Sequence, residues 1–138
     1  MTTPTRTWDD ASLKRLQGVH PDLRKVMDRA LQEAPFPFRV MEGLRTVARQ
    51  KEMVRIGASR TMRSRHLTGH AVDIVPLVDL DRDGKIETEE LFNWPLIRQL
   101  APIIKQVAID LKIEVEWGGD WKSFPDGPHW QLDWATYP

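Results

Sequence analysis

An aspartate stands in the middle of an apolar segment and limits how that segment can fold. The stretch AVDIV, residues 71–75, is rich in β-branched residues and predicts a buried strand. The carboxylate of Asp73 is costly to bury in such a strand unless it is paired or bound to a metal ion. The chain therefore has to bring partners to Asp73 from elsewhere in the sequence.

Apolar periodicity and end signals predict three helices and four strands. We expect helices from Pro21 to the sequence APFPF, from Thr46 as N-cap to Gly57, and from Pro95 to Leu111. Strands are expected at 38–44, 71–78, 113–117 and 129–134. This order indicates an α+β fold, a small antiparallel sheet with flanking helices, in which histidines and acids at strand ends converge on one face. The length of 138 residues is typical of one domain, residues 1–138.

Composition excludes several classes of partner and site. Twenty Lys and Arg residues balance 20 Asp and Glu residues, so no net charge attracts nucleic acid or anionic lipid. The absence of cysteine excludes disulfides and Cys-based zinc sites. Residues 1–16 contain no apolar run typical of a signal peptide, and no segment is long enough to span a membrane. We expect a monomer made in a cytosol, without nucleic-acid binding or membrane anchoring.

Two histidines precede Asp73 closely in the sequence. His66 and His70 have the spacing of a helical zinc pair, but that motif requires Glu directly after the first His and a helical backbone. Leu67 and Gly69 occupy this stretch instead, which disfavours the helical pair. His66 with Asp73, spanning a loop into the strand, is the better pair, and a third ligand would leave one zinc position open for water.

A third ligand has to come from the two remaining histidines. His20 precedes a proline at a helix start, where we expect a structural role. His129 opens a predicted strand and has Asp126 three residues before it, an acid that could take a proton from a zinc-bound water. A single histidine is more often structural than a ligand. Two in acid-rich loops, together with Asp73, indicate a metal site.

The sequence SRHLTGHAVD at 64–73, followed by DGPH at 126–129, resembles the signature of the LAS zinc peptidases. That group includes lysostaphin-type enzymes, D-Ala-D-Ala carboxypeptidases and dipeptidases, and the hedgehog signalling domain. The length and the segments VHPDLRKVMDRAL, GLRTVARQ and EWGGDWKSFPDGPHWQL are similar to phage L-alanyl-D-glutamate endopeptidases, the endolysins that cut peptidoglycan stem peptides. The resemblance runs from about Leu16 to Leu132 and implies a hedgehog/DD-peptidase-like zinc peptidase fold.

The resemblance implies a zinc site and a catalytic base. His66, Asp73 and His129 match the three zinc ligands. Asp126 matches the general base, which activates the water and then protonates the leaving amine; many relatives carry Glu there, which is one methylene longer. Two imidazoles and one carboxylate leave zinc with a net positive charge, able to activate water and polarise a carbonyl.

The resemblance also implies substrate contacts. Arg45 matches an arginine that stabilises the developing oxyanion or holds a substrate carboxylate, and Ser64 matches a residue near the acidic end of the substrate. The alternative for Arg45 is a surface salt bridge with Glu42. His70 lies off the ligand pattern and is interpreted as structural. Among the tryptophans, which are more often core residues, Trp121 is the candidate to line a substrate groove.

A second metal motif occupies residues 79–90, DLDRDGKIETEE. It matches the EF-hand calcium loop at positions 1, 3, 5, 6, 9 and 12. The side-chain ligands would be Asp79, Asp81, Asp83, Glu87 and Glu90, with Lys85 contributing its backbone carbonyl. The alternative is an acidic turn that caps the next helix. Because a predicted strand precedes the loop where an EF-hand has a helix, we expect a single calcium loop inserted in the peptidase domain.

Three functions remain open. The first is a phage endolysin, a zinc- and calcium-binding L-alanyl-D-glutamate endopeptidase that acts on the stem peptide of bacterial peptidoglycan. The second is a D-Ala-D-Ala carboxypeptidase or dipeptidase of the same fold, and the third is a non-catalytic calcium-dependent binding module. The missing signal peptide favours the first, because an endolysin can wait in the host cytoplasm until a holin releases it to the wall. The presence of Asp126 argues against the third.

Overall fold

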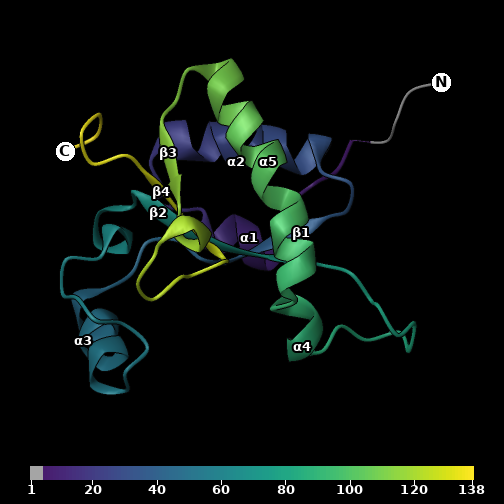
Figure 1. The fold of residues 1–138 in the computed structure, drawn as a ribbon, viewed down its shortest axis with the longest axis horizontal. Coiled ribbons are helices and arrows are strands. Elements are labelled where there is room, and N and C mark those ends of the chain that lie inside the picture. The colour runs from purple at the N-terminus through teal and green to yellow at the C-terminus, as the bar shows by residue number, and fades with distance from the viewer. Residues whose placement is uncertain (1–4) are drawn as a thin grey trace.

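The computed structural model describes residues 5–138, and its strands form one four-stranded antiparallel sheet (Figure 1). The strands are β1 (Phe38–Glu42), β2 (Ala71–Pro76), β3 (Val115–Trp117) and β4 (His129–Leu132), in the spatial order β1-β2-β4-β3. All three pairings are antiparallel. The expected α+β fold with a small antiparallel sheet is therefore confirmed.

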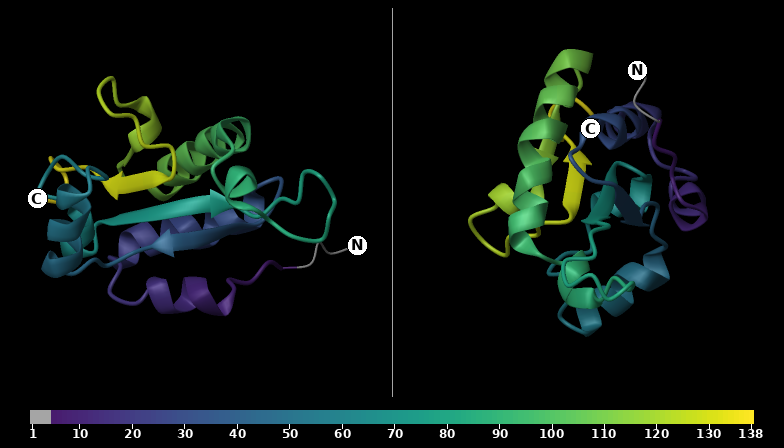
Figure 2. Two further views of the ribbon diagram at one scale, coloured as in Figure 1. Left: turned by 90° about the horizontal axis from the view of Figure 1, so that it is seen from below. Right: turned by 90° about the vertical axis from the view of Figure 1, so that its right-hand side faces the viewer.

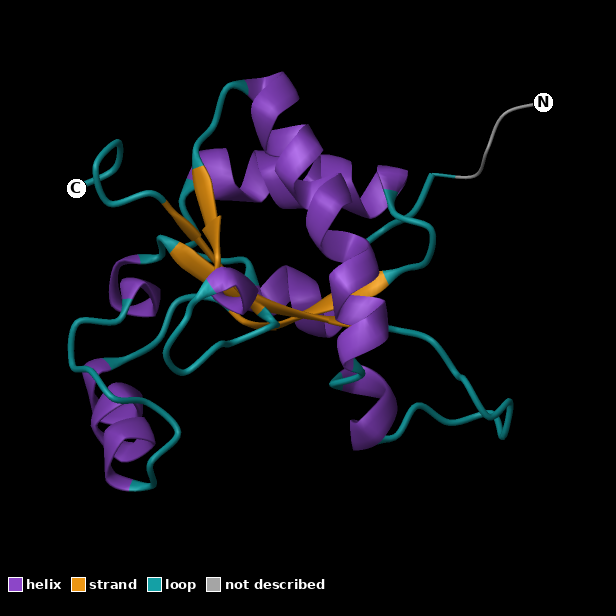
Figure 3. Cartoon of the chain, viewed as in Figure 1, coloured by secondary structure: helices purple, strands orange, loops and turns teal. Residues whose placement is uncertain are grey.

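Helices separated by loops surround this sheet (Figure 3). The three predicted helices correspond to α2 (Pro21–Glu33), α3 (Val47–Arg55) and α5 (Trp94–Leu111). Four short elements were not predicted from the sequence: the helices α1 (Asp10–Arg15) and α4 (Thr88–Leu91) and the 3-10 turns η1 (Arg65–Thr68) and η2 (Gly118–Asp120). Within residues 5–138, no helix has the length and apolar character needed to cross a membrane.

The core lies between α2, α5 and one face of the sheet. Helix α2 buries an apolar stripe at helical spacing, which explains why this segment is helical and how it is oriented. Leu23, Val26, Met27, Ala30 and Leu31 form that stripe. They share one core with the inner residues of α5 and with side chains of all four strands. Figure 2 shows α2 and α5 beside the sheet, whereas α3 lies apart at one end.

Strand register aligns a row of polar side chains on the other face of the sheet. Both sequence neighbours of Asp73 are buried in the core or against it, and strand alternation turns Asp73 away from them. Asp73 pairs with His129 on β4 and with Glu42 on β1. A bulge in β1 at Met41 places Glu42, and not Met41, opposite Asp73.

A glycine closes the turn that leads into β2. Gly69 ends η1 with φ 75°, a left-handed conformation. A Cβ on Gly69 would lie 2.1 Å from the carbonyl oxygen of Gly18, so two loops meet here without room for a side chain. The amide of His20 donates to the carbonyl of Gly69 over 2.8 Å and fixes this contact.

We predict that Gly69→Ala destabilises the protein much more than Gly57→Ala. Both glycines have positive φ, but a Cβ at Gly57 meets nothing within 4 Å. The left-handed backbone alone should cost about 1–2 kcal/mol at Gly57, and overpacking should add about 1–3 kcal/mol at Gly69. Urea unfolding of the two variants measures the difference. Equal losses of unfolding free energy would contradict the close approach of the two loops.

Candidate metal centre and cleft

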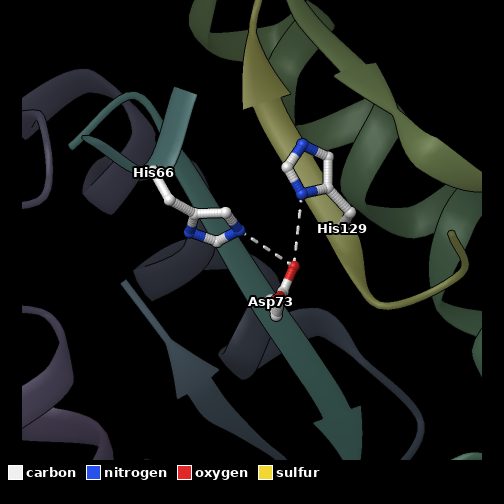
Figure 4. A group of neighbouring side chains, drawn as sticks. All are labelled: His66, Asp73 and His129. Atoms are coloured by element: carbon white, nitrogen blue, oxygen red, sulfur yellow. Dashed lines mark hydrogen bonds and ion pairs between the residues drawn. The ribbon is translucent and has the colours of Figure 1, made fainter. Parts of the chain in front are cut away.

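Three residues from three elements converge on one point (Figure 4). His66 comes from η1, Asp73 from β2, and His129 is the first residue of β4. Their ligand atoms all lie within 4.8 Å of one another. Nε2 of His66 and Nδ1 of His129 each lie 3.2 Å from Oδ1 of Asp73. The structure thus brings together the three residues predicted as zinc ligands, and His70 is not among them.

In His66 and in His129, the ring nitrogen that points away from Asp73 faces an oxygen acceptor. Nδ1 of His66 lies 2.8 Å from the carbonyl oxygen of Gly43, and Nε2 of His129 lies 2.8 Å from Oε1 of Gln131. Each of these nitrogens must carry the ring hydrogen to make its bond. In the neutral rings, the remaining lone pairs therefore point at the carboxylate of Asp73. Three acceptors facing one another require a cation or additional protons.

The orientation of Gln131 is itself fixed by a carboxylate. Glu116 pairs with Gln131 across β3 and β4, and its Oε2 accepts a 2.9 Å hydrogen bond from Nε2 of Gln131. Because a carboxylate only accepts, the amide nitrogen must face Glu116 and the amide oxygen must face His129. This pair was not predicted from the sequence. The signal was available, since Gln131 follows His129 by two residues on a strand and so shares its face.

The close approach of these three side chains shifts the pKa values of His129 and Asp73. Burial lowers the pKa of His129, but its bonds with Asp73 and Gln131 and the negative charges of Asp73 and Asp126 outweigh burial and raise it. Burial raises the pKa of Asp73, but hydrogen bonds and positive charge from His129 and His66 hold this pKa well below its usual range. Two imidazole nitrogens and one carboxylate oxygen, held by further hydrogen bonds, fit zinc with one open position.

Asp126 lies in the turn before β4 and lines the same cleft. Its backbone amide donates to the carbonyl of Gly118, and its carbonyl accepts from the amide of His129 over 3.2 Å, which ties this turn to the strand. Within residues 5–138, the carboxyl of Asp126 makes no hydrogen bond. Burial and the negative charge of Asp73 raise its pKa, against the opposing effect of nearby cationic groups. It is therefore free to accept and return a proton.

Arg45 is buried beside the metal centre. Its Nε and Nη2 donate to the two carboxylate oxygens of Glu42 over 2.6 and 2.8 Å, and Nη1 donates to Oε1 of Gln50 over 2.7 Å. Nη2 also lies 3.8 Å from Oδ2 of Asp73. The ion pair with Glu42 that we considered as an alternative is present, but it is not a surface bridge, since the Arg45 side chain is only 5% exposed.

The other predicted polar residues have local structural contacts. Ser64 caps η1 by accepting from the amide of His66 over 3.2 Å, and it also lines the cleft. His20 caps α2 by accepting from the amide of Asp22. The ring of His70 lies 5.3 Å from that of His20 at an interplanar angle of 45°, and neither belongs to the three converging residues.

A cleft with a volume of about 480 Å³ opens over the centre. Its walls come from the loop between α3 and η1 and from the segment that follows η2. Trp121 lines it with its ring 5.0 Å from that of His129, and Trp134 lines it further along. Trp117 and Trp130 stack on each other in the core at 5.8 Å. The tryptophans are thus divided between core and cleft.

The acidic loop after β2 gathers four carboxylates. Figure 1 shows this loop projecting from the body of the molecule before α4. Ligand atoms of Asp79, Asp81, Asp83 and Glu90 lie within 4.8 Å of one another. Oδ1 of Asp79 is buried without a hydrogen-bond partner, whereas its Oδ2 accepts from the amide of Gly84 over 2.8 Å. A buried carboxylate oxygen without a hydrogen-bond partner is a suitable ligand for a cation in this loop.

Two predicted calcium ligands lie outside this group of four. Glu87 is the N-cap of α4 and exchanges hydrogen bonds with Glu90 in a capping box, as the alternative of an acidic helix cap requires. Lys85, which would contribute only its carbonyl, has an exposed side chain. The capping box and the four carboxylates occur together, so the two interpretations of the motif do not exclude each other.

Comparisons with known proteins agree on one family. A sequence model of the phage L-alanyl-D-glutamate peptidases matches residues 7–133. The L-alanyl-D-glutamate peptidase of Escherichia phage T5 is 32% identical over 129 residues, 91% of this chain and 88% of that protein. That of Listeria phage A118 is 36% identical over 98 residues, 71% of this chain but 31% of that longer protein. The crystal structure of the Serratia marcescens L-Ala D-Glu endopeptidase ChiX matches with a TM-score of 0.80 and 46% identity, covering 94% of this chain and 91% of that chain.

We predict that Gln131→Leu weakens zinc binding while the fold persists. The variant removes the acceptor that holds the hydrogen on Nε2 of His129, so the lone pair on Nδ1 is no longer fixed toward the centre. Loss of such a supporting hydrogen bond typically lowers metal affinity by about 10–100-fold. Competition with a chromophoric chelator measures the affinity. Gln106→Leu, which removes an exposed bond to Asp110 on α5, is the matched control. Equal zinc affinity in both variants would refute the role of Gln131.

Proposed function

The chain belongs to the family of phage L-alanyl-D-glutamate peptidases, and we propose that it is a zinc-dependent endopeptidase that cuts peptidoglycan stem peptides between L-Ala and D-Glu. One observation carries the proposal: two imidazole lone pairs and a carboxylate meet at one point, with the unbonded carboxyl of Asp126 in the same cleft. The names of the relatives support the choice of bond.

His66, Asp73 and His129 would hold the zinc ion. Bound there, zinc supplies Lewis-acid activation of the scissile carbonyl and of the attacking water. The protein contributes the orientation of the ligands, because Gly43 and Gln131 fix the hydrogens of the two rings. Trp121, whose ring lies 5.0 Å from that of His129, would form one wall of the substrate groove.

Asp126 would act as the proton carrier. It takes a proton from the water that attacks the carbonyl carbon of L-Ala. It then delivers this proton to the amine nitrogen of D-Glu as the carbon–nitrogen bond breaks. The products are a free carboxyl on L-Ala and a free amino group on D-Glu. Burial helps, because it raises the pKa of Asp126 toward the working pH and so makes the carboxylate a better base than one in water.

Arg45 would stabilise the negative charge that develops on the carbonyl oxygen, or hold a carboxylate of the substrate. Three of its five N–H groups are used by Glu42 and Gln50, which leaves one on each terminal nitrogen. A guanidinium held by three hydrogen bonds loses little conformational freedom when it binds a ligand. We propose that Ser64, at the end of η1, lies near the acidic end of the substrate.

We further propose that residues 79–90 bind calcium and that the whole chain, residues 1–138, is one peptidase domain with this loop inserted. Hydrogen bonds with Glu90 and Asp83 and the crowding of negative charge raise the pKa of Glu87 to about 8. A divalent ion bound among these carboxylates would relieve this repulsion. The loop begins six residues after Asp73, so its ordering would restrain the strand that carries a zinc ligand.

As a phage endolysin, the protein would remain in the cytoplasm of the host bacterium until a holin releases it, and it would act as a monomer on the wall. Cytosolic calcium is low, and calcium in the envelope is higher. A calcium requirement would therefore keep activity low before release.

The test of the proposed function is mass spectrometry of peptidoglycan digested by the purified protein. We expect new D-Glu amino termini and MurNAc that carries a single L-Ala. Release of free D-Ala, or of the D-Ala-D-Ala dipeptide, as the main product would instead identify a carboxypeptidase or dipeptidase. No cleavage by the zinc-loaded protein would favour a binding module.

Two variants separate the roles within the centre. Asp126→Asn keeps the shape of the side chain and removes the base, so we expect full zinc content and a loss of cleavage of at least about 100-fold. His129→Ala should lose both zinc and cleavage. Elemental analysis measures the zinc content. Full zinc in His129→Ala, or an active Asp126→Asn, would show that the assignment is wrong.

We predict that calcium binds residues 79–90 and raises the rate of lysis. Calorimetric titration measures binding, and a lysis assay with and without chelator measures the effect on activity. Asp79→Ala should abolish binding, because it removes the orphaned buried oxygen. Asp110→Ala, an exposed acid on α5, is the control. No binding at millimolar calcium would remove the site, and binding without a change in lysis would leave calcium a purely structural role.

A further inference from the structure

One wall of the cleft carries three arginines, which we call the arginine arm: Arg60, Arg63 and Arg65. They come from the loop between α3 and η1 and from the first residue of η1. Within residues 5–138, none of the three forms an ion pair with a carboxylate. Positive charge therefore gathers on this wall without a bound counter-charge from the protein.

Arg65 is the buried member of the arm. It is 4% exposed, its guanidinium carbon lies 4.0 Å from the ring centre of Trp134, and its Nε is buried without a hydrogen-bond partner. Nη2 donates to the carbonyl oxygens of Leu132 and Tyr137, which are neutral. Burial lowers the pKa of Arg65, and the more distant charges of Asp133 and Glu116 only partly oppose it. An anion in the cleft would compensate this buried charge.

The other two members are exposed and also contact neutral groups. The guanidinium of Arg60 lies 4.5 Å from the ring centre of Phe124, and its Nη1 donates to the hydroxyl of Ser123 over 3.3 Å. The guanidinium of Arg63 lies 5.7 Å from the ring centre of Trp134. Aromatic contacts orient both side chains and leave most of their N–H groups free for a ligand.

We propose that the arginine arm binds a carboxylate on the glutamyl half of the substrate, the half that leaves after cleavage. This inference rests on the proposed function. The two halves of the substrate differ in charge. On the acyl side, L-Ala is joined to the lactyl group of MurNAc through an amide, so that half is neutral. On the other side, D-Glu is linked onward through its side chain and keeps its α-carboxylate next to the scissile bond, and further carboxylates follow along the peptide.

Charge complementarity therefore fixes which way the substrate lies in the cleft. The anionic half extends along the arginine arm toward Trp134, and the neutral glycan half extends from the other end of the centre. Guanidinium groups bind carboxylates through paired charge-assisted hydrogen bonds, which makes arginine suited to this task. The same arm would discriminate against a stem peptide whose D-Glu α-carboxylate is amidated, because the amide has no charge.

The test measures binding without requiring catalysis. The peptide D-Glu-γ-L-Lys-D-Ala is titrated calorimetrically into the chain, beside two analogues: one amidated at the glutamyl α-carboxylate and one amidated at its C-terminus. We expect α-amidation to weaken binding by about tenfold, as loss of a partly exposed charge-assisted contact would. Arg63→Gln should remove most of this preference, because it lowers affinity for the acid and leaves affinity for the α-amide unchanged. Arg49→Gln, an exposed arginine of α3 outside the cleft lining, should keep the preference.

The two possible sources of the carboxylate give different results. Sensitivity to C-terminal amidation alone, again lost in Arg63→Gln, would assign the arm to the C-terminal carboxylate. Equal binding of all three peptides, or a preference that survives in both Arg63→Gln and Arg60→Gln, would overturn the proposal. A chain that binds the acid selectively but cuts no peptidoglycan would keep the arm and refute the proposed peptidase. A chain that cuts the acid and the α-amide substrates with equal KM would support the proposed peptidase and refute the role of the arginine arm.

Discussion

Asp73 is the constraint on which the rest of the structure depends. Its carboxylate lies on a strand whose other side chains fill the core, and the nearby guanidinium and imidazole groups offset the cost of burying it there. Strand pairing brings His129 to one side of Asp73 and Glu42 to the other. The guanidinium of Arg45 balances Glu42 and lies within 4 Å of Asp73. The two imidazoles face its other oxygen, each with a nitrogen 3.2 Å from it.

The same strand connects the two acidic regions of the chain. Asp73 lies in the middle of β2, and Asp79 follows soon after its end. In both places several carboxylates lie close together, so that a cation would be stabilised there. The other groups around the two sites differ. Around Asp73 the partners are buried imidazoles, which suit a transition metal. Around Asp79 they are the exposed carboxylates of Asp81 and Asp83, the buried carboxylate of Glu90 and backbone groups, which suit a hard cation such as calcium.

Much of the fold could be predicted from the sequence, because its signals are local. The apolar stripe of α2, the Thr46 cap of α3 and the β-branched run of β2 each depend on residues within a few positions. The convergence of His66, Asp73 and His129 followed from spacing and from a family resemblance, and the structure brings the three together. The short helix α1 escaped prediction because six residues are too few to give a clear period.

What could not be predicted depends on contacts between distant segments. The burial of Arg45 beside Asp73 requires the pairing of β1 with β2, and the bond between Glu116 and Gln131 requires that of β3 with β4. The contact of Arg65 with Trp134 in the arginine arm requires the C-terminal segment to return to η1. Sequence spacing contains no such information.

The bulge at Met41 has a consequence for how related sequences should be compared. It inserts one residue between the part of β1 that faces the core and the part that faces the metal centre. Deleting Met41 would leave Val40 opposite Ile74 and Glu42 opposite Asp73 in a regular ladder, with Gly43, whose carbonyl orients His66, still next in line. A β1 that kept Met41 but lost the bulge would instead place Met41 opposite Asp73 and shift Glu42 and Gly43 by one position. An alignment with a shorter relative should therefore place its gap at Met41, so that Glu42 and Gly43 stay matched with the residues in the same positions beside the metal centre.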